Sequence, residues 1–154
     1  KLNPNCHIDG MKEEICESNI VDLVGDCSII VDATDNIETR KVLNRASFRM
    51  GIPFVYGGVN ELNGMITTFI PRETPCFECV FPHSESQKKP IGVLGPLPAL
   101  VAALQTLEVL KIILNIGALL KGRLLFFSGI DMTFKEIKIE KNPDCKVCNS
   151  PRGV

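Results

Sequence analysis

Four cysteines in two pairs are the residues whose spacing most clearly predicts chemistry in this sequence. Cys76 and Cys79 enclose two residues, as do Cys145 and Cys148. A two-residue gap lets both thiolates of a pair reach one ion, and two pairs complete the tetrahedral shell that structural Zn²⁺ prefers. Because four cysteines leave no open coordination position, we expect a structural rather than a catalytic metal site. The 65 residues between Cys79 and Cys145 would place much of the domain inside the loop that the metal closes.

Other chemistry for these two pairs agrees less well with their surroundings. A thioredoxin-like redox pair begins a helix that follows a strand, whereas Cys76 follows Pro75 and Cys145 follows a polar Asn-Pro-Asp stretch. Disulfides are typical of secreted chains, but seven cysteines is an odd number and we see no apolar signal segment. We therefore expect zinc in a cytoplasmic protein. Iron in a rubredoxin-like shell uses the same ligands and stays open as an alternative.

Three further cysteines, Cys6, Cys16 and Cys27, show no ligand spacing. Free cysteine behaves as a small hydrophobic residue and is among the most buried residue types. We therefore expect these three to be small buried apolar side chains.

Asp35 is the second candidate for chemistry. It comes directly after a short apolar run that predicts a buried strand, and ligands of open α/β sheets bind beyond the carboxyl ends of the strands. A carboxylate there could hold Mg²⁺, and the neighbouring Asn36 could reach a ribose or phosphate oxygen. The alternative is that Asp35 and Asn36 only cap the helix that follows. The residues alone leave both interpretations open.

The elements that would position these side chains follow from apolar periodicity and turn residues. Strand 28–33 should be buried on both faces, and helix 37–50 should end at Gly51. A long helix at 99–116 is apolar nearly all round, which predicts burial against a sheet or a partner subunit. The other expected elements are a helix at 18–24, strands at 53–59, 65–70, 124–128 and 133–140, and an irregular loop at 71–96.

This order predicts an α/β fold: a β-α-β unit with parallel strands, followed by antiparallel strands and the cysteine clip. The 154 residues, 45% of them hydrophobic, are enough for one domain spanning 1–154. The net charge is −1, with no basic stripe, so we expect no nucleic-acid partner. Polar residues within 93–120 favour a buried helix over a membrane span.

Several segments together resemble the E1-like ThiF/MoeB/HesA family, whose members are ATP-dependent activating enzymes of ubiquitin-like sulfur carriers. The resemblance runs in order along nearly the whole chain. It rests on Val-Asp-Ala-Thr-Asp-Asn at 31–36, Arg40, Asn44, residues 62–69 around Gly64, Pro-Cys-Phe-Glu-Cys-Val-Phe-Pro at 75–82, Gly-Val-Leu-Gly at 92–95, residues 104–111, and Cys-Lys-Val-Cys at 145–148.

The resemblance implies a Rossmann-like mixed sheet and a role for each candidate residue. Asp35 would be the catalytic aspartate at the ATP site that serves Mg²⁺, with Asn36 beside it at the nucleotide. The four cysteines would hold a structural zinc. The reaction would be attack of a carrier's C-terminal Gly-Gly carboxylate on the α-phosphate of ATP, giving an acyl-adenylate and pyrophosphate. Family members are dimers, which predicts a homodimer or pairing with a nucleotide-binding half.

Two departures from the family pattern shape the functional prediction. Nothing before Asp35 matches the family's glycine-rich phosphate loop, so we expect that the N-terminal nucleotide-binding half is missing and that the chain, which begins with Lys1, is a fragment. Residues 87–91 read Gln-Lys-Lys-Pro-Ile, where many relatives carry a further cysteine. That absence predicts an adenylation-only parent.

Three hypotheses result. The chain is the C-terminal part of an adenylating enzyme for a ThiS- or MoaD-like carrier, inactive on its own. Alternatively, it is a non-catalytic zinc-stabilised module that binds a carrier or pairs with an ATP-binding subunit. The third is a zinc-stabilised fold with no nucleotide function. If half of the fold is missing, a sheet edge and apolar surface should be exposed.

Overall fold

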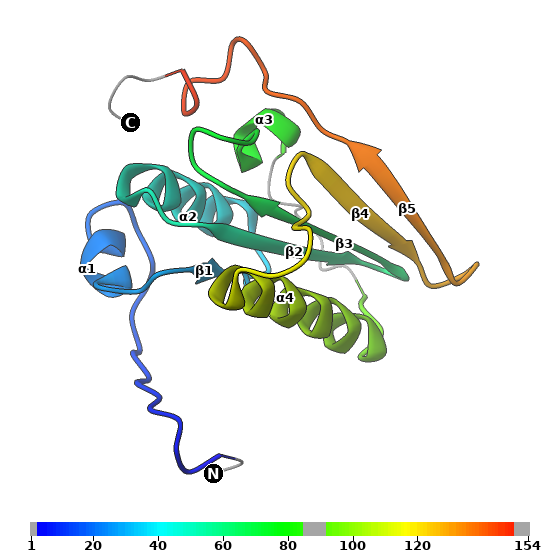
Figure 1. Cartoon of the computed structure of the whole chain (residues 1–154), viewed down its shortest axis with the longest axis horizontal. Coiled ribbons are helices and arrows are strands. Elements are labelled where there is room, and N and C mark those ends of the chain that lie inside the picture. Colours follow the sequence, from blue (N-terminus) through cyan, green and yellow to red (C-terminus); the bar gives the residue numbers. More distant parts are fainter. Residues whose placement is uncertain (1–2, 85–91, 150–154) are drawn as a thin grey trace.

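A five-stranded mixed sheet forms the centre of the computed structural model, which describes residues 3–84 and 92–149 (Figure 1). The strand order is β1-β2-β3-β4-β5; β1 and β2 are parallel and each later pair is antiparallel. The predicted β-α-β unit with an antiparallel extension is therefore confirmed. The elements are α1 (Ile20–Val24), β1 (Ile30–Val31), α2 (Ile37–Met50), β2 (Phe54–Asn60), β3 (Asn63–Phe69), α3 (Phe77–Val80), α4 (Pro96–Leu114), β4 (Arg123–Ser128) and β5 (Thr133–Lys138).

Helix α2 begins and ends where its flanking residues predict. Asn36 Oδ1 accepts a hydrogen bond from Thr39 N at 2.8 Å, which satisfies one of the free backbone donors of the first turn. At the other end Gly51 has a φ of 72°, a left-handed conformation that glycine adopts without steric cost. Both ends of α2 are thus fixed by local chemistry.

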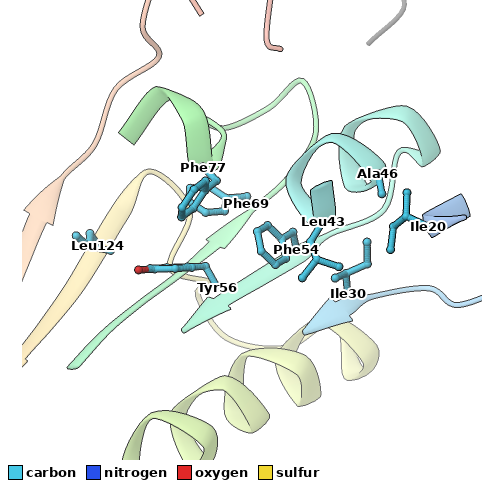
Figure 2. Close-up of a cluster of buried hydrophobic side chains, with 9 residues drawn as sticks. All are labelled: Ile20, Ile30, Leu43, Ala46, Phe54, Tyr56, Phe69, Phe77 and Leu124. Atoms are coloured by element: carbon cyan, nitrogen blue, oxygen red, sulfur yellow. The ribbon is translucent and has the colours of Figure 1, made fainter. Parts of the chain in front are cut away.

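Helices cover the two faces of the sheet differently (Figure 1). Helices α2 and α3 lie on one face, over a core cluster that includes the rings of Phe54, Tyr56, Phe69 and Phe77 (Figure 2). Helix α4 lies on the opposite face, against β2 and β3. The β2 side chains alternate between these faces because a strand has a period of two residues.

The prediction that strand 28–33 is buried on both faces is wrong. Strand β1 spans only Ile30–Val31, and while Ile30 is buried, Val31 is 45% exposed. Among the residues that the structure describes, β1 pairs with β2 alone and so forms an edge of the sheet. The expected open edge of the sheet is therefore present, because no second strand pairs with β1 among the described residues.

Helix α4 packs against the sheet with one face, as predicted, while its opposite face is exposed. Its inward stripe consists of Leu97, Val101, Gln105 and Glu108. The outward residues Leu107, Leu110, Ile113 and Leu114 are 45–64% exposed. By length and hydropathy alone α4 could cross a membrane, and 22% of its most apolar stretch is buried inside the protein. The two polar residues of the inward stripe, Gln105 and Glu108, form hydrogen bonds with the residues beneath α4. Glu108 accepts from Thr68 Oγ1 at 2.6 Å and from Leu120 N at 2.8 Å.

Two smaller expectations also need correction. Cys6, Cys16 and Cys27 are exposed rather than buried, because they lie outside both of the hydrophobic clusters into which the core divides. The predicted irregular loop 71–96 contains the short helix α3, and α4 starts at Pro96, three residues earlier than expected. Proline suits that position because a helix's first residues need no N–H donor.

Candidate functional site

The two cysteine pairs come together as one cluster. All four Sγ atoms lie within 4.8 Å of one another. The Cys76–Cys79, Cys76–Cys145 and Cys79–Cys148 Sγ–Sγ distances are 3.8, 3.6 and 3.4 Å. A tetrahedral shell with Zn–S bonds of ~2.3 Å needs sulfurs about 3.8 Å apart. The four residues predicted as metal ligands therefore fit a zinc ion in number, chemistry and spacing.

Each pair is shaped by a tight backbone turn. Cys76 precedes the first turn of α3, and Cys79 N donates to Cys76 O at 3.0 Å. In the second pair Cys145 N donates to Asn142 O at 3.0 Å, and Asn149 N donates to Cys145 O at 3.1 Å. These turns point both thiols of a pair to the same side.

The cluster is a small core of its own. Cys76, Cys79 and Cys145 are buried, Cys148 is half-buried, and Phe48 of α2 packs with them together with Val147. The neighbouring Cys148 thiol and burial raise the pKa of the Cys76 thiol, and the backbone N–H of Cys79 acts against them by lowering it. Burial likewise raises the pKa of Cys79. A cation bound by these thiols would require them to lose their protons, so its affinity would depend on pH.

The second half of α2 holds the first cysteine pair from the side. Asn44 Oδ1 accepts from Phe77 N at 3.0 Å. Arg45 of α2 donates to the Glu78 carboxylate from Nε at 3.0 Å and from Nη2 at 3.4 Å. Its Nη1 donates to Glu17 Oε1 at 3.1 Å. These bonds fix residues 77 and 78 to α2, and with them the turn that carries Cys76 and Cys79.

The Asp35 loop lies at the opposite end of α2. The Asp35 side chain is exposed, and its only hydrogen-bond contact among the described residues is with Asn36 Nδ2, at 3.5 Å. Asn36 itself caps α2 through Oδ1. The capping alternative therefore holds for Asn36, whereas Asp35 stays free to bind a cation. A nucleotide contact by either residue remains a prediction.

A buried ion pair, which the sequence reasoning missed, holds this loop in place. Asp32 is 2% exposed and accepts from Arg40 Nε at 2.8 Å and from Thr34 N and Oγ1 at 2.9 and 2.7 Å. Arg40 Nη2 also donates to Thr34 O at 2.6 Å and to Gly57 O at 3.3 Å. The guanidinium carbon lies 5.4 Å from the centre of the Tyr56 ring. Asp32 and Arg40 thus fix the backbone immediately before Asp35.

Gln105 of α4 supports the same region from the other face of the sheet. Its Nε2 donates to Asp32 O at 2.8 Å and to Val55 O at 3.1 Å, joining the ends of β1 and β2. This approach requires Gly57, because a Cβ there would lie 2.5 Å from the Gln105 carboxamide. One signal could have revealed the network: Asp32 is a charged residue in an apolar run, and a buried charge needs a partner.

Residues 87–91, where the lack of a cysteine predicts an adenylation-only parent, lie outside the described residues.

A separate open groove of about 630 Å³ runs along the C-terminal end of α4, lined by Lys111, Ile116, Leu119, Lys121 and Arg123 among others. Its cations contact the chain's own carboxylates, Lys121 with Glu73 and Arg123 with Glu136. Lys111, the third lining cation, likewise pairs with Glu108, so each cation that the described residues place in this groove contacts a carboxylate of the chain.

Comparison with known proteins places these features in a family. The ThiF family model matches residues 1–147. The SAMP-activating enzyme E1 of Haloferax volcanii is 39% identical over 152 residues, covering 96% of this chain and 56% of that protein. The sulfur carrier protein adenylyltransferase of Thermus thermophilus is 31% identical over 157 residues, covering 96% of this chain and 58% of that protein.

Solved structures give the same fold. The crystal structure of E. coli MccB with MccA-N7isoASN superposes with a TM-score of 0.75 at 17% identity, covering 90% of this chain and 45% of that chain. The mixed sheet with its antiparallel extension is therefore an E1-like fold. The chain spans a little over half the length of the two curated relatives described above.

Proposed function

Because the chain belongs to the ThiF family, we propose that it is part of an ATP-dependent adenylyltransferase. Its substrate would be the C-terminal Gly-Gly of a ubiquitin-like sulfur carrier of the ThiS or MoaD type, activated as an acyl-adenylate. The observation that carries this proposal is the similarity of nearly the whole chain to two activating enzymes, one of which is a sulfur carrier adenylyltransferase.

Asp35 is the residue that we assign to Mg²⁺ and ATP. Its carboxylate is exposed beyond the carboxyl end of β1, where open α/β sheets bind ligands, and carboxylate oxygen is the ligand that Mg²⁺ prefers. ATP would supply the adenylyl group. The role of Asp32, Arg40 and Gln105 is to hold the loop in a fixed position before any ligand arrives, since preorganised charge needs no rearrangement during reaction.

Zinc in the four-cysteine cluster would be structural. Four thiolates leave no open position for a substrate, and the cluster lies at the far end of α2 from Asp35. The metal would tie the C-terminal segment to the turn around α3. Its contribution to the reaction would be the stability of the scaffold.

We propose that the isolated chain is inactive. The sequence before Asp35 holds no glycine-rich phosphate loop, so adenylation would need a further segment or subunit that supplies one. The open edge of β1 is the position where such a unit could add a strand. A homodimer, pairing with a nucleotide-binding half, and a cytoplasmic location all stay proposals.

The carrier would have an apolar surface available on the β4–β5 hairpin. Ile130, Met132, Phe134 and Ile137 are 47–75% exposed there. Phe134 and Ile137 lie on opposite faces of β5, and β5 is an edge strand with unpaired backbone groups among the described residues, to which a partner's extended segment could pair. We therefore expect a protein partner rather than a small molecule at this surface.

ATP–pyrophosphate exchange with a Gly-Gly-ending carrier tests the proposal. The chain alone should show no exchange above background, whereas the chain joined to or mixed with its glycine-rich half should show carrier-dependent exchange. Asp35→Ala in the active form should abolish that exchange while leaving the thermal stability unchanged. Full exchange by the Asp35→Ala variant would refute the assignment of Asp35.

The second candidate function is a non-catalytic zinc-stabilised module that binds a carrier. The four-cysteine cluster and the exposed apolar residues of the β4–β5 hairpin are the observations that favour it. In that case the chain should bind the carrier through the β4–β5 hairpin, and no added nucleotide-binding half should produce exchange. Phe134→Asp should then reduce carrier binding, with Lys135→Asp as the matched control for charge on the same strand.

A further inference from the structure

Asn44 is a buried polar residue with half of its hydrogen-bonding capacity unused. Its side chain lies on the inner face of α2 and the residue is 2% exposed. Oδ1 accepts from Phe77 N at 3.0 Å, whereas Nδ2 has no partner among the described residues. Leaving a buried amide donor unpaired costs its full desolvation penalty, so a native structure is expected to supply an acceptor.

The surroundings of this amide point to the metal cluster. Phe77, to which Asn44 is anchored, directly follows Cys76. Asn44 and Cys76 line the same cavity of about 10 Å³, with Phe48 and Thr74 also in its wall. A cavity of that size holds at most about one water molecule. Of the groups that line this cavity, the Cys76 sulfur is the acceptor that metal binding would make negative, and a single trapped water is the alternative partner for Nδ2.

We propose that Asn44 is a positioning residue of the metal centre and that its Nδ2–H donates a hydrogen bond to the Cys76 thiolate when the ion is bound. The inference rests on the proposed zinc site. A metal-bound thiolate carries more negative charge than a thiol and is the stronger acceptor. The same amide would hold the backbone of residue 77 through Oδ1 and the sulfur of residue 76 through Nδ2.

This arrangement gives Asn44 a role that packing alone would not require. Groups that bond to metal ligands orient them and adjust their charge, and their removal typically costs about 10–100-fold in metal affinity. A hydrogen bond to a thiolate lowers the energy of its lone pairs. The energy of the sulfur-to-metal charge-transfer absorption therefore reports directly on this bond.

The test uses the full chain loaded with Co²⁺ as a spectroscopic probe and with Zn²⁺ for affinity. Asn44→Asp keeps an oxygen for Phe77 N and, when ionised, has no donor, whereas Asn44→Leu removes both functions without adding charge. Both variants should shift the sulfur-to-cobalt band to lower energy and weaken Zn²⁺ binding by about 10-fold or more in chelator competition. Ser47→Ala is the matched control, since Ser47 lines the same cavity and its Oγ donates to Ile52 O instead.

The outcomes separate the two proposals. If the unaltered chain binds Co²⁺ with no tetrahedral thiolate spectrum, the zinc site itself is wrong and this inference falls with it. If the unaltered chain binds normally and both Asn44 variants match Ser47→Ala in band energy and affinity, the inference alone is overturned, and a trapped water is the partner of Nδ2. Band shifts in both Asn44 variants, with Ser47→Ala unchanged, would support it.

Discussion

The cysteine cluster and the Asp35 loop lie at opposite ends of α2, and different interactions hold each of them in place. At its C-terminal half the cysteine cluster brings four sulfurs together, an arrangement that only a cation makes stable as thiolates. At its N-terminal end the Asp35 loop is held by charges that the chain supplies itself, Asp32 and Arg40. Under the proposed zinc site, the first region would depend on an added ion, whereas the second forms its ion pair from the chain's own residues. Perturbations of the two regions should therefore differ in size and in their response to metal.

The largest effect is expected from removing a metal ligand. Cys145→Ser should abolish stoichiometric zinc, since apparent binding energies of structural zinc reach ~10–16 kcal/mol, and should release the segment that carries the second cysteine pair. Elemental analysis should fall from about one zinc per chain to near zero, and hydrogen exchange at 142–149 should accelerate. Cys27→Ser, which changes an exposed cysteine outside the cluster, is the control. Unchanged zinc content in Cys145→Ser would show that Cys145 is not a zinc ligand, and the contrast between the two ends of α2 would fail.

The next largest effect should come from breaking the buried ion pair. Asp32→Asn leaves the Arg40 guanidinium without its counter-charge, and the loss of one partner of a buried pair costs about 3–5 kcal/mol. Urea denaturation should show this loss equally with and without excess zinc. Lys41→Ala, which breaks a more exposed pair with Glu38 on the same helix, should cost about 0.5 kcal/mol or less. If excess zinc restored the stability that Asp32→Asn loses, the two ends of α2 would not be independent.

Gly57→Ala tests how tightly Gln105 holds the ends of β1 and β2. The new Cβ would lie 2.5 Å from the Gln105 carboxamide, and overpacking of this kind costs about 1–3 kcal/mol. The free energy of unfolding should fall by that amount, while Gly92→Ala, where a Cβ meets nothing within 4 Å, should leave it nearly unchanged. Equal stability of the two variants would show that Gln105 moves freely.

The smallest effect separates the two residues of the loop. Asn36→Ala removes the helix cap and should cost about 1 kcal/mol, whereas Asp35→Ala should change stability by less than about 0.5 kcal/mol. Thermal unfolding of both variants measures the difference. A stability loss in Asp35→Ala as large as that in Asn36→Ala would give Asp35 a structural role and weaken its assignment to Mg²⁺.

Features set by neighbouring residues in the chain could be predicted, as could the cysteine cluster, whose distant halves each carry a ligand-spacing motif; other features set by distant neighbours could not. The bounds of α2 follow from Asn36 and Gly51, and the cysteine cluster follows from the ligand spacing. The exposure of Val31 and of the outward face of α4 depends on which elements lie beside them, which composition does not reveal. The pairing of Asp32 with Arg40 needs the fold, because a strand end and a helix turn must meet before the two charges can touch.

The separation of the two cysteine pairs along the chain also matters during biosynthesis. Cys76 and Cys145 are 69 positions apart, and ribosomes add about 5–20 residues per second. Roughly 3–14 s therefore pass between synthesis of the first pair and completion of the second. If the cluster holds zinc as proposed, Cys76 and Cys79 would form an incomplete site throughout that interval, and the supply of zinc and reductant would bear on how a newly made chain matures.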